Sequence, residues 1–343
     1  MVPRHRRGWR FHLGESNAMS KITYNVSSED VGKRLDVFLV EKTGSSRSEI
    51  QKLIGVGSVL INQRRPKKAG EELKENYAVA VLSSEDVEHS RDTEDVDKSI
   101  YKKIQIVADE PDYLVVAKPA GLLSHPTPAG EPASLAGWIL EQYPALRGVG
   151  EDAHRPGIVH RLDKDASGLM VIAKSQAMFD HLKQQFKHRE IEKEYIVLVY
   201  GTFSKDHDVI DFDIDRGKDG RMVARPKLDQ FKVSNVGKEQ EGKIAKTEYR
   251  VRDVYKGRFS LLRVKIYTGR THQIRVHMFA IHHPVVGDRL YIDKKLLKKG
   301  DEPLDRLFLH SAKLGFTDLS GFFRVHTLNL SDDLKEYLAR ITI

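Results

Sequence analysis

Apolar residues in the first quarter of the chain recur at helical spacing and then at strand spacing. The stretch 22–26 alternates as a strand does, and 58–62 and 77–81 have the composition of two more strands on either side of a turn at 67–70. Two sets at i, i+3 and i+4 predict two helices between the first and second strands: Leu35, Phe38 and Leu39, then Ile50, Leu53 and Ile54. We therefore expect a small unit of two helices and short strands.

Beyond residue 98 the apolar positions come in short runs instead of long helical periods. Helical spacing is clearest at 134–143 and 176–186. The runs that predict strands are 114–117, 170–173, 196–200 and 261–266. This pattern predicts an α+β fold whose central sheet is mixed or mainly antiparallel.

Two segments have compositions that do not favour a packed structure. Residues 83–98 are acidic and serine-bearing, with almost no large apolar side chains, so burial cannot offset their ordering entropy and we interpret them as a linker. Residues 1–18 are rich in arginine and lack the apolar run of a secretory signal. We interpret them as a disordered extension or an upstream start, with Met19 as the alternative first residue. The expected domains are then 33–82 and 99–343.

Charge and composition narrow the class of partner. The chain has 343 residues and a formal net charge of +8, which favours a polyanionic partner because lysine and arginine release counterions from phosphates. It contains no cysteine, which excludes disulfides, thiolate metal sites and cysteine nucleophiles. No apolar run approaches the roughly 18 residues that span a bilayer, so we expect no membrane association.

The most informative motif lies at residues 160–168, with the sequence His-Arg-Leu-Asp-Lys-Asp-Ala-Ser-Gly. Side chains at i and i+2 of an extended stretch share a face, so we expect Arg161 and Asp163 to project together. The apolar residues 157–159 and 169–173 predict a short strand on each side of the motif. Asp163 is then expected at the end of a strand, at the mouth of a cleft and not inside a core. A carboxylate beside a guanidinium stays ionised near neutral pH, which suits a nucleophile or a general base.

Four motifs in order along the chain resemble the RluA/RluD-type family of pseudouridine synthases. The motif at 160–168 has Ala-Ser-Gly where the family usually has Thr-Ser-Gly, which leaves Asp163 in register. The others are Lys-Pro-Ala-Gly with His-Pro at 118–126, Glu-Lys-Glu-Tyr at 192–195, and Gly-Arg-Thr-His-Gln-Ile-Arg-Val-His at 269–277. The resemblance extends from about residue 33 to about residue 333. It implies an enzyme that isomerises uridine to pseudouridine in RNA.

The resemblance also implies roles for individual residues. Asp163 is the essential carboxylate, and attack on the sugar and proton abstraction to a glycal intermediate both stay open. Tyr195 occupies the family's active-site tyrosine position, where its ring can stack on uracil and its phenol can assist proton removal. Arg275, beside the apolar face of a predicted helix, is expected to pair with Asp163. Arg270 is expected to contact phosphate, and Arg161 to fill the space left by an extruded nucleotide. Because the reaction is internal and redox-neutral, we expect neither cofactor nor metal.

Residues 33–82 resemble the S4-type RNA-binding module, named for a protein of the small ribosomal subunit. The resemblance rests on Lys-Arg-Leu-Asp at 33–36, Ser-Arg-Ser at 46–48, and Gly-Ser-Val-Leu-Ile-Asn at 57–62. The expected phosphate-contacting residues are Arg34, Arg47, Lys52, Arg64, Arg65, Lys67 and Lys68. The expected partner is large-subunit ribosomal RNA, with transfer RNA as the alternative, and we expect a cytoplasmic monomer.

Two other functions are compatible with parts of the sequence. Asp163 with Asp165 could be the carboxylate pair of a metal-dependent nuclease. The chain could also be a catalytically silent ribosome-assembly factor that only binds RNA, although the intact Asp163, Tyr195 and Arg275 argue against this. A set of histidines suggests a metal site, but its spacing matches no standard zinc motif: His272, His277, His282 and His283.

Overall fold

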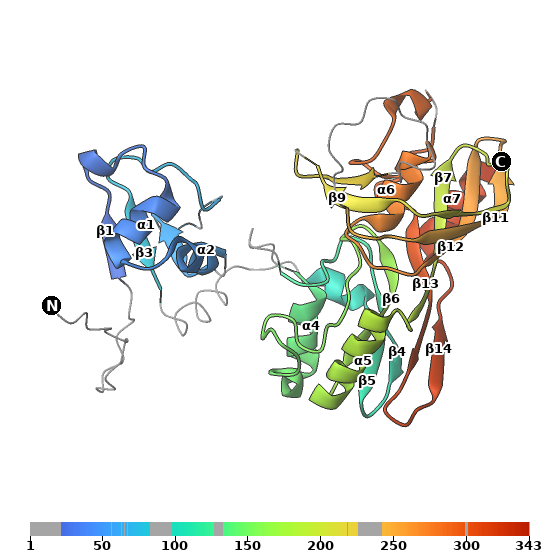
Figure 1. The fold of residues 1–343 in the computed structure, drawn as a ribbon, viewed down its shortest axis with the longest axis horizontal. Coiled ribbons are helices and arrows are strands. Elements are labelled where there is room, and N and C mark those ends of the chain that lie inside the picture. Colours follow the sequence, from blue (N-terminus) through green and yellow to red (C-terminus); the bar gives the residue numbers. More distant parts are fainter. Residues whose placement is uncertain are drawn as a thin grey trace. The chain divides into compact units, whose positions relative to one another are not determined.

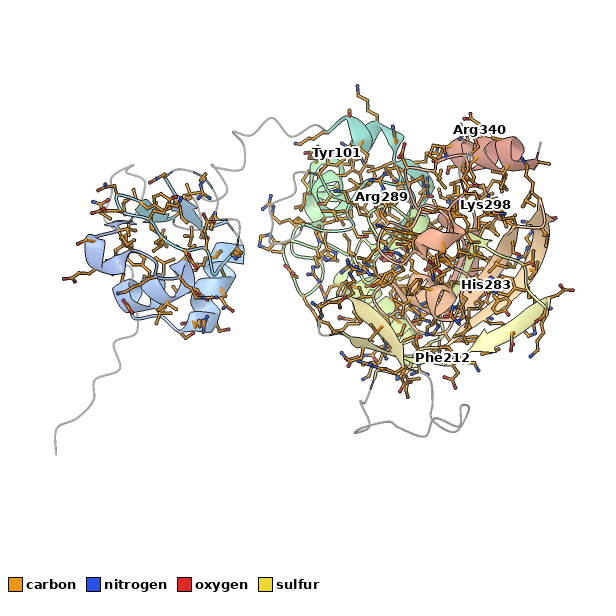
Figure 2. The ribbon with its side chains drawn as sticks, turned by 90° about the horizontal axis from the view of Figure 1, so that it is seen from above. Tyr101, Phe212, His283, Arg289, Lys298 and Arg340 are labelled. Carbon is orange, nitrogen blue, oxygen red and sulfur yellow. The ribbon has the colours of Figure 1, made fainter. Side chains whose placement is uncertain are left out.

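The computed structural model describes two compact units, one within residues 22–82 and a larger one that starts at residue 98 (Figure 1). Side chains fill the interior of each unit (Figure 2). The expected extension at 1–18 and nearly all of the expected linker lie outside the described residues, so both stay predictions. The residues described are 22–55, 57–62, 64, 66, 68–82, 98–126, 133–217, 219–225, 242–298 and 301–342.

The amino-terminal unit packs two helices on a small antiparallel sheet. The helices are α1 (Leu35–Thr43) and α2 (Arg47–Gly55), and a short 3-10 turn, η1 (Ser28–Asp30), precedes them. The sheet has three strands in the order β1-β3-β2: β1 (Ile22–Asn25), β3 (Ala78–Val81) and β2 (Val59–Ile61). The residues at helical spacing enter one core with β2 and β3, so the predicted helices and strands are confirmed.

The second unit is built on a nine-stranded sheet. Its path runs β4-β5-β6-β13-β7-β12-β11-β8, with β14 paired to β13, and β6 with β13 is its parallel pair. The expected mixed, mainly antiparallel sheet is therefore confirmed. The strands are β4 (Gln105–Asp109), β5 (Tyr113–Lys118), β6 (Ser167–Ala173), β7 (Glu192–Tyr200), β8 (His207–Ile210), β11 (Thr247–Tyr255), β12 (Phe259–Ile266), β13 (Leu309–Thr317) and β14 (Phe323–Thr327). A separate two-stranded sheet pairs β9 (Asp213–Arg216) with β10 (Met222–Arg225).

Helices cover both faces of this sheet. Alternate residues of β5 and β6 enter two different core clusters, one with α4 (Leu135–Gln142) and α6 (Gln273–Ala280), the other with α5 (Gln176–His188). Strands buried on both faces read as continuous apolar runs, which explains the runs in the sequence. The carboxyl-terminal helix α7 (Asp332–Thr342) shares a core cluster with residues of β7 and β12. Short 3-10 turns complete the unit: η2 (Ser99–Lys103), η3 (Pro144–Leu146) and η5 (Lys294–Leu296).

The two halves of the sheet meet at a short link between β6 and β13. Only two residue pairs form this parallel ladder, His310 with Ser167 and Ser311 with Gly168. Gly168 has φ +117°, and a Cβ there would lie 2.3 Å from the Ser311 carbonyl oxygen, so the backbones approach this closely only with glycine. The loop that carries Asp163 ends directly at this link.

The strand expected at 157–159 does not form. Only Ile158 bridges to Ile172 of β6, and the rest of the segment is irregular. The reason lies in the next residue: the backbone N–H of Val171 donates to the His160 side chain, at 3.0 Å, and not to a strand carbonyl. Asp163 therefore follows a loop held by a side chain, and the prediction of a strand there was wrong.

Candidate active site

Asp163 lines an open cleft of about 600 Å³ in the second unit. The walls come from the loop before β6, the segment from α5 to β7, and the segment from β12 to α6. Among the described residues that line it, Asp163 is the one carboxylate. The cations of the lining are Arg155, Arg161, Lys187, Arg189, Lys193, Arg270 and Arg275. The cleft is thus a basic surface around a single acid.

Lys118, the last residue of β5, holds the loop that carries Asp163 in place. Lys118 is 1% exposed, and its ammonium group donates to the carbonyl oxygens of Pro119 and Leu122 on one side, at 2.9 and 2.7 Å. On the other side it donates to the carbonyl oxygens of Lys164 and Ala166, at 3.2 and 2.8 Å. Burial lowers the pKa of Lys118 to about 7. This lysine therefore ties the loop after β5 to the loop that carries Asp163.

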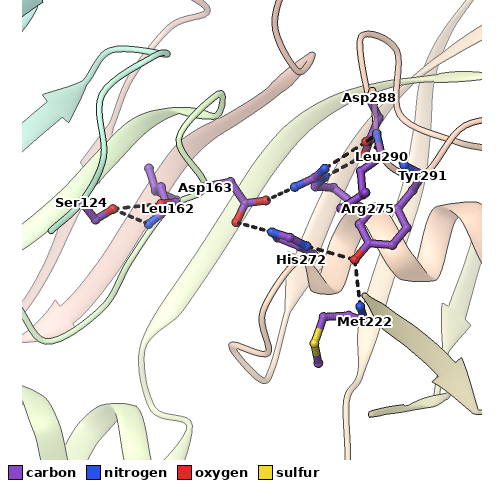
Figure 3. Close-up of polar contacts among 9 residues, drawn as sticks. All are labelled: Ser124, Leu162, Asp163, Met222, His272, Arg275, Asp288, Leu290 and Tyr291. Carbon is purple, nitrogen blue, oxygen red and sulfur yellow. Dashed lines mark hydrogen bonds and ion pairs between the residues drawn. The ribbon is translucent and has the colours of Figure 1, made fainter. Parts of the chain in front are cut away.

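Two further side chains hold the same loop. Ser124 Oγ donates to the Leu162 carbonyl at 2.9 Å and accepts from the Leu162 N–H at 3.0 Å (Figure 3). His160 accepts from Val171 and stacks on Phe186, with ring centroids 4.9 Å apart. Burial lowers the pKa of His160 to about 3, so the ring is neutral and its Nε2 can accept. Side chains of the motif at 118–126 thus hold the backbone of the motif at 160–168 through hydrogen bonds.

Arg275, from α6, bridges two carboxylates. Its Nη1 donates to Asp163 Oδ2 at 3.0 Å, while Nε and Nη2 donate to the two oxygens of Asp288 at 2.7 and 2.9 Å (Figure 3). Asp288 is buried and also accepts from the backbone N–H groups of Leu290 and Tyr291. Burial opposes the charge, but the bonds to Asp288 and Asp163 raise the pKa of Arg275. Asp288 thereby orients the guanidinium toward Asp163.

The expected ion pair between Arg275 and Asp163 is present, but Arg161 is not the guanidinium that contacts the carboxylate. Arg161 is exposed on the cleft wall, whereas Asp163 forms an ion pair with Arg275 and lies 4.0 Å from the His272 ring. The i, i+2 rule holds for an extended strand, and this segment is a loop, so the two side chains need not point the same way.

Tyr195 reaches the cleft from β7 and is 6% exposed. Burial raises the pKa of its phenol, and the charge of Asp163 adds to this effect. The phenol is therefore protonated at neutral pH. The structure thus brings Asp163, Tyr195 and Arg275 together in one cleft.

His272 is a cleft residue that the sequence indicated only as a member of a histidine set, without a role in the reaction. It precedes α6 in a left-handed conformation, with φ 56°. Its Nε2 lies 4.0 Å from Asp163 Oδ1, and its Nδ1 lies 3.0 Å from Tyr291 Oη (Figure 3). The sequence analysis also missed the buried Asp288, which binds Arg275. The signal that could have indicated it is a carboxylate directly after the apolar Val-Val-Gly at 285–287.

Lys193 and Arg270 both contribute positive charge to the cleft wall. Lys193 is 8% exposed and lies over the ring of Phe186, 5.3 Å from its centroid. Burial lowers the pKa of Lys193 to about 8. Arg270 is partly exposed and donates from Nε to the Ile244 carbonyl at 3.1 Å, so its other nitrogens can still contact a ligand.

The expected RNA-contacting residues of the amino-terminal unit lie on its surface. Arg34 and Arg47 donate to the buried carboxylate of Asp36, each at 3.0 Å, and their side chains are about half exposed. Arg64 pairs with Glu71. Arg65, Lys67 and the side chain of Lys52 lie outside the described residues. Asp36 therefore orients two of the expected arginines on one surface of this unit.

The other chemical groupings considered from the sequence are not brought together. Asp165 is exposed and does not line the cleft. His277 is buried, with its ring nitrogens bonded to Thr247 Oγ1 and the Phe212 carbonyl. Within the described part of the chain, no group of three or more His, Asp or Glu side chains could hold a metal ion. Nor does that part contain a helix long and apolar enough to cross a membrane.

Comparisons with known proteins show which families and proteins the chain is similar to. Residues 112–280 match a family described as RNA pseudouridylate synthase, and residues 33–79 match the S4 domain. An "uncharacterized RNA pseudouridine synthase" of Aquifex aeolicus (strain VF5) is 40% identical over 273 residues, 79% of each chain. A "ribosomal large subunit pseudouridine synthase D" of Yersinia pestis is 32% identical over 303 residues, 86% of each chain. The solved structure of human RNA pseudouridylate synthase domain containing 4 has a similar fold, with a TM-score of 0.54 at 23% identity over 71% of this chain and 94% of that one.

Proposed function

Because the chain belongs to the RNA pseudouridylate synthase family and carries an S4 domain, we propose that it isomerises uridines of large-subunit ribosomal RNA, with Asp163 as the catalytic carboxylate. The observation that carries the proposal is the position of Asp163: it is the one acid among the described residues of a basic cleft, paired with Arg275 and near Tyr195.

The reaction breaks the bond between uracil and the anomeric carbon, turns the base, and rejoins it through carbon 5. Arg275 binds one oxygen of Asp163, which leaves the other free for the nucleotide. That oxygen can attack the anomeric carbon or take a proton from carbon 2′, and both routes begin from the ionised carboxylate. Holding the freed base in place is the second requirement, because rejoining then stays an intramolecular step.

Tyr195 is suited to hold the base and to assist the last proton transfer. Its ring offers a stacking surface inside the cleft. While Asp163 is ionised, the phenol keeps its proton, because burial and that charge raise its pKa. Once Asp163 is esterified or protonated, its negative charge is lost and the phenol can release its proton more readily. Tyr195 can then help to move the proton that leaves carbon 5.

The basic residues around Asp163 support RNA as the substrate. Cations along a cleft attract a phosphate backbone and neutralise it on contact. We propose that Arg270 contacts phosphate and that Arg161, exposed on the wall, fills the space that the flipped nucleotide leaves. The arginines of the S4 domain, Arg34, Arg47 and Arg64, would contact structured RNA, as would Lys52 and Arg65. Because Asp163, Tyr195 and Arg275 come from one chain, the site is complete in a monomer, and we propose that the protein acts as one. With ribosomal RNA as the proposed substrate, the proposed place of action is the cytoplasm.

Two neighbouring aspartates provide the test of the reaction and of the residue. We expect Asp163→Asn to abolish tritium release from RNA labelled at carbon 5 of uridine, with RNA affinity within a few-fold of wild type. Asp165→Asn is the matched control and should keep its activity, because Asp165 does not line the cleft. Equal loss in both variants, together with RNA cleavage that requires Mg²⁺, would favour a nuclease instead.

The target RNA needs a separate test. Large-subunit ribosomal RNA is supported by the S4 domain and by relatives named ribosomal large subunit pseudouridine synthase D that match over 86% of their length. We expect pseudouridines mapped by chemical reverse-transcription stops to disappear from this RNA when the gene is deleted. Faster modification of bulk transfer RNA by the purified enzyme would refute the target but not the reaction.

A further inference from the structure

A chain of contacts beside Asp163 favours one of the two tautomers of a neutral His272 ring. The backbone N–H of Met222 donates to Tyr291 Oη at 3.1 Å, and Tyr291 Oη lies 3.0 Å from His272 Nδ1 (Figure 3). Because the phenol oxygen already accepts a bond, its own proton is free to be donated, and Nδ1 of a neutral ring can accept it. The ring proton then lies on Nε2, the nitrogen nearer to Asp163.

The distance between His272 and Asp163 leaves room for a third group. His272 Nε2 and Asp163 Oδ1 are 4.0 Å apart, which is longer than a hydrogen bond. Both residues line the cleft, and the other oxygen of Asp163 is bound to Arg275. An oxygen of a bound nucleotide close to Asp163 would therefore meet the N–H of His272.

We propose that His272 is a catalytic residue that donates a hydrogen bond from Nε2 to an oxygen of the target nucleotide, and that Tyr291 is the positioning residue that holds this tautomer. The inference rests on the proposed function, because the ligand is the uridine that Asp163 converts. The acceptor is either a ribose hydroxyl or a uracil carbonyl, both of which accept hydrogen bonds.

The surroundings of His272 keep the ring neutral, as a donor of this kind requires. Burial lowers the pKa of His272, and the guanidinium groups of Arg275 and Arg161 act in the same direction, against the carboxylates of Asp163 and Asp288. The ring also precedes the first turn of α6, where the helix dipole disfavours a cation.

The backbone of His272 is consistent with a functional constraint. A non-glycine residue in the left-handed region costs of order 1 kcal/mol and persists only where surrounding structure holds it. Here φ is 56°, and the conformation directs the side chain to Asp163 and Tyr291. Asparagine adopts this region readily, which makes it a useful replacement in the test below.

Two amide substitutions separate the two ring nitrogens. His272→Gln puts an amide N–H where Nε2 lies, whereas His272→Asn puts one where Nδ1 lies and leaves the cleft without the donor. We expect kcat for tritium release to fall less than tenfold in His272→Gln and about a hundredfold in His272→Asn, the loss seen for one oxyanion donor. Thermal unfolding of each variant reports any loss of folding. The reverse order of kcat would mean that His272 only supports Tyr291, and would overturn the proposal.

Tyr291→Phe tests the positioning role. Phenylalanine keeps the ring that faces Arg275 at 5.1 Å but removes the hydroxyl that holds Nδ1. We expect kcat to fall several-fold with an unchanged KM in the wild-type background, and no further fall in the His272→Gln background, because an amide has no tautomer to fix. Equal losses in both backgrounds would refute this role.

Substrate variants identify the oxygen. RNA with 2′-deoxyuridine, 2-thiouridine or 4-thiouridine at the target position removes or weakens one acceptor at a time. The loss caused by His272→Asn should shrink for one of these substrates, and an unchanged loss with all three would overturn a direct contact. Wild-type enzyme that forms no pseudouridine in any RNA would overturn the proposed function and this inference together, whereas active wild type with the reverse variant order overturns only the inference.

Discussion

The groups around Asp163 differ in the pH range over which they carry charge. Arg275 is held as a cation by two carboxylates, and His272 and His160 are kept neutral by burial. Lys193 changes its charge near neutral pH, since burial lowers its pKa to about 8. The charge of the cleft therefore changes within the range that an assay can cover.

Lys193 gives a pH-dependent prediction. In the free protein its ammonium is charged below pH about 8 and neutral above it, so one phosphate-binding cation is lost as pH rises. In an Asp163→Asn background we expect the Kd for RNA to rise about fivefold between pH 7 and 9.5, the value of roughly 1 kcal/mol for one such contact. With Lys193→Arg the Kd should stay low and independent of pH, and with Lys193→Met it should stay high and independent of pH. Identical curves for wild type and Lys193→Arg would remove Lys193 from the RNA surface.

Tyr195→Phe tests the phenol apart from the ring. The ring that stacks on uracil is retained, so we expect the Kd for RNA to stay within about threefold of wild type. Turnover should fall by about 10², the lower range for a group that takes part in proton transfer. Single-turnover tritium release measures this directly. A parallel loss of affinity and turnover would mean that the hydroxyl only binds substrate.

The sequence predicted part of this site because its chemistry lies within short motifs. The pairing of Arg275 with Asp163 was expected and is present, 112 residues apart in the chain. The sequence indicated His272 only as a metal ligand. Its actual contacts could not be predicted, because they depend on a left-handed turn and on Tyr291, which lies 19 residues away. A motif shows that a residue type is present but not which atom it contacts.

At the scale of elements, buried runs and helical spacing gave the strands and helices, whereas a buried lysine could not be foreseen. Lys118 occurs in the motif Lys-Pro-Ala-Gly, where a lysine is usually on the surface. Its burial depends on carbonyl groups from two loops, one of them 46 to 48 residues away. The strand missed at 157–159 has a similar cause, because the His160 side chain takes the N–H that would have extended the ladder.

Lys118→Met should therefore destabilise the second unit. Methionine fills similar space but leaves several buried carbonyl groups without their donor, each at about 1–3 kcal/mol. We expect the free energy of unfolding in urea to fall by at least about 3 kcal/mol, and kcat to fall because the Asp163 loop loses its tie. Lys102→Met, on the exposed surface of η2, is the control and should change neither. An unaltered urea midpoint for Lys118→Met would show that the loops are held by other contacts.

At the scale of the molecule, the amino-terminal unit and the catalytic unit each have a core of their own. This supports the proposed division into an RNA-binding domain and a catalytic domain. An RNA-binding unit tethered to the catalytic one raises the local concentration of structured RNA without altering the chemistry.

Deletion of residues 1–90 should therefore change binding more than catalysis. We expect a higher KM for ribosomal RNA and a weaker dependence of KM on salt, because phosphate contacts are lost. The kcat on a minimal stem-loop should stay similar. Filter binding and steady-state kinetics at several salt concentrations measure these effects. A collapse of kcat on the stem-loop would indicate that the amino-terminal unit contributes to the cleft itself.

The short link between β6 and β13 also has a consequence for the synthesis of the chain. Strand β13 lies between β6 and β7 in the sheet but follows both by more than a hundred residues in the sequence. Since a chain leaves the ribosome from its amino terminus, β6 has no neighbour on that side until residues 309–317 emerge. The Asp163 loop ends at this link, so its carboxyl-terminal end lacks the β13 partner until then. A nascent chain could thus bind RNA through its first domain before the sheet beside Asp163 is complete, so that the order of translation itself delays catalysis until residues 309–317 have emerged.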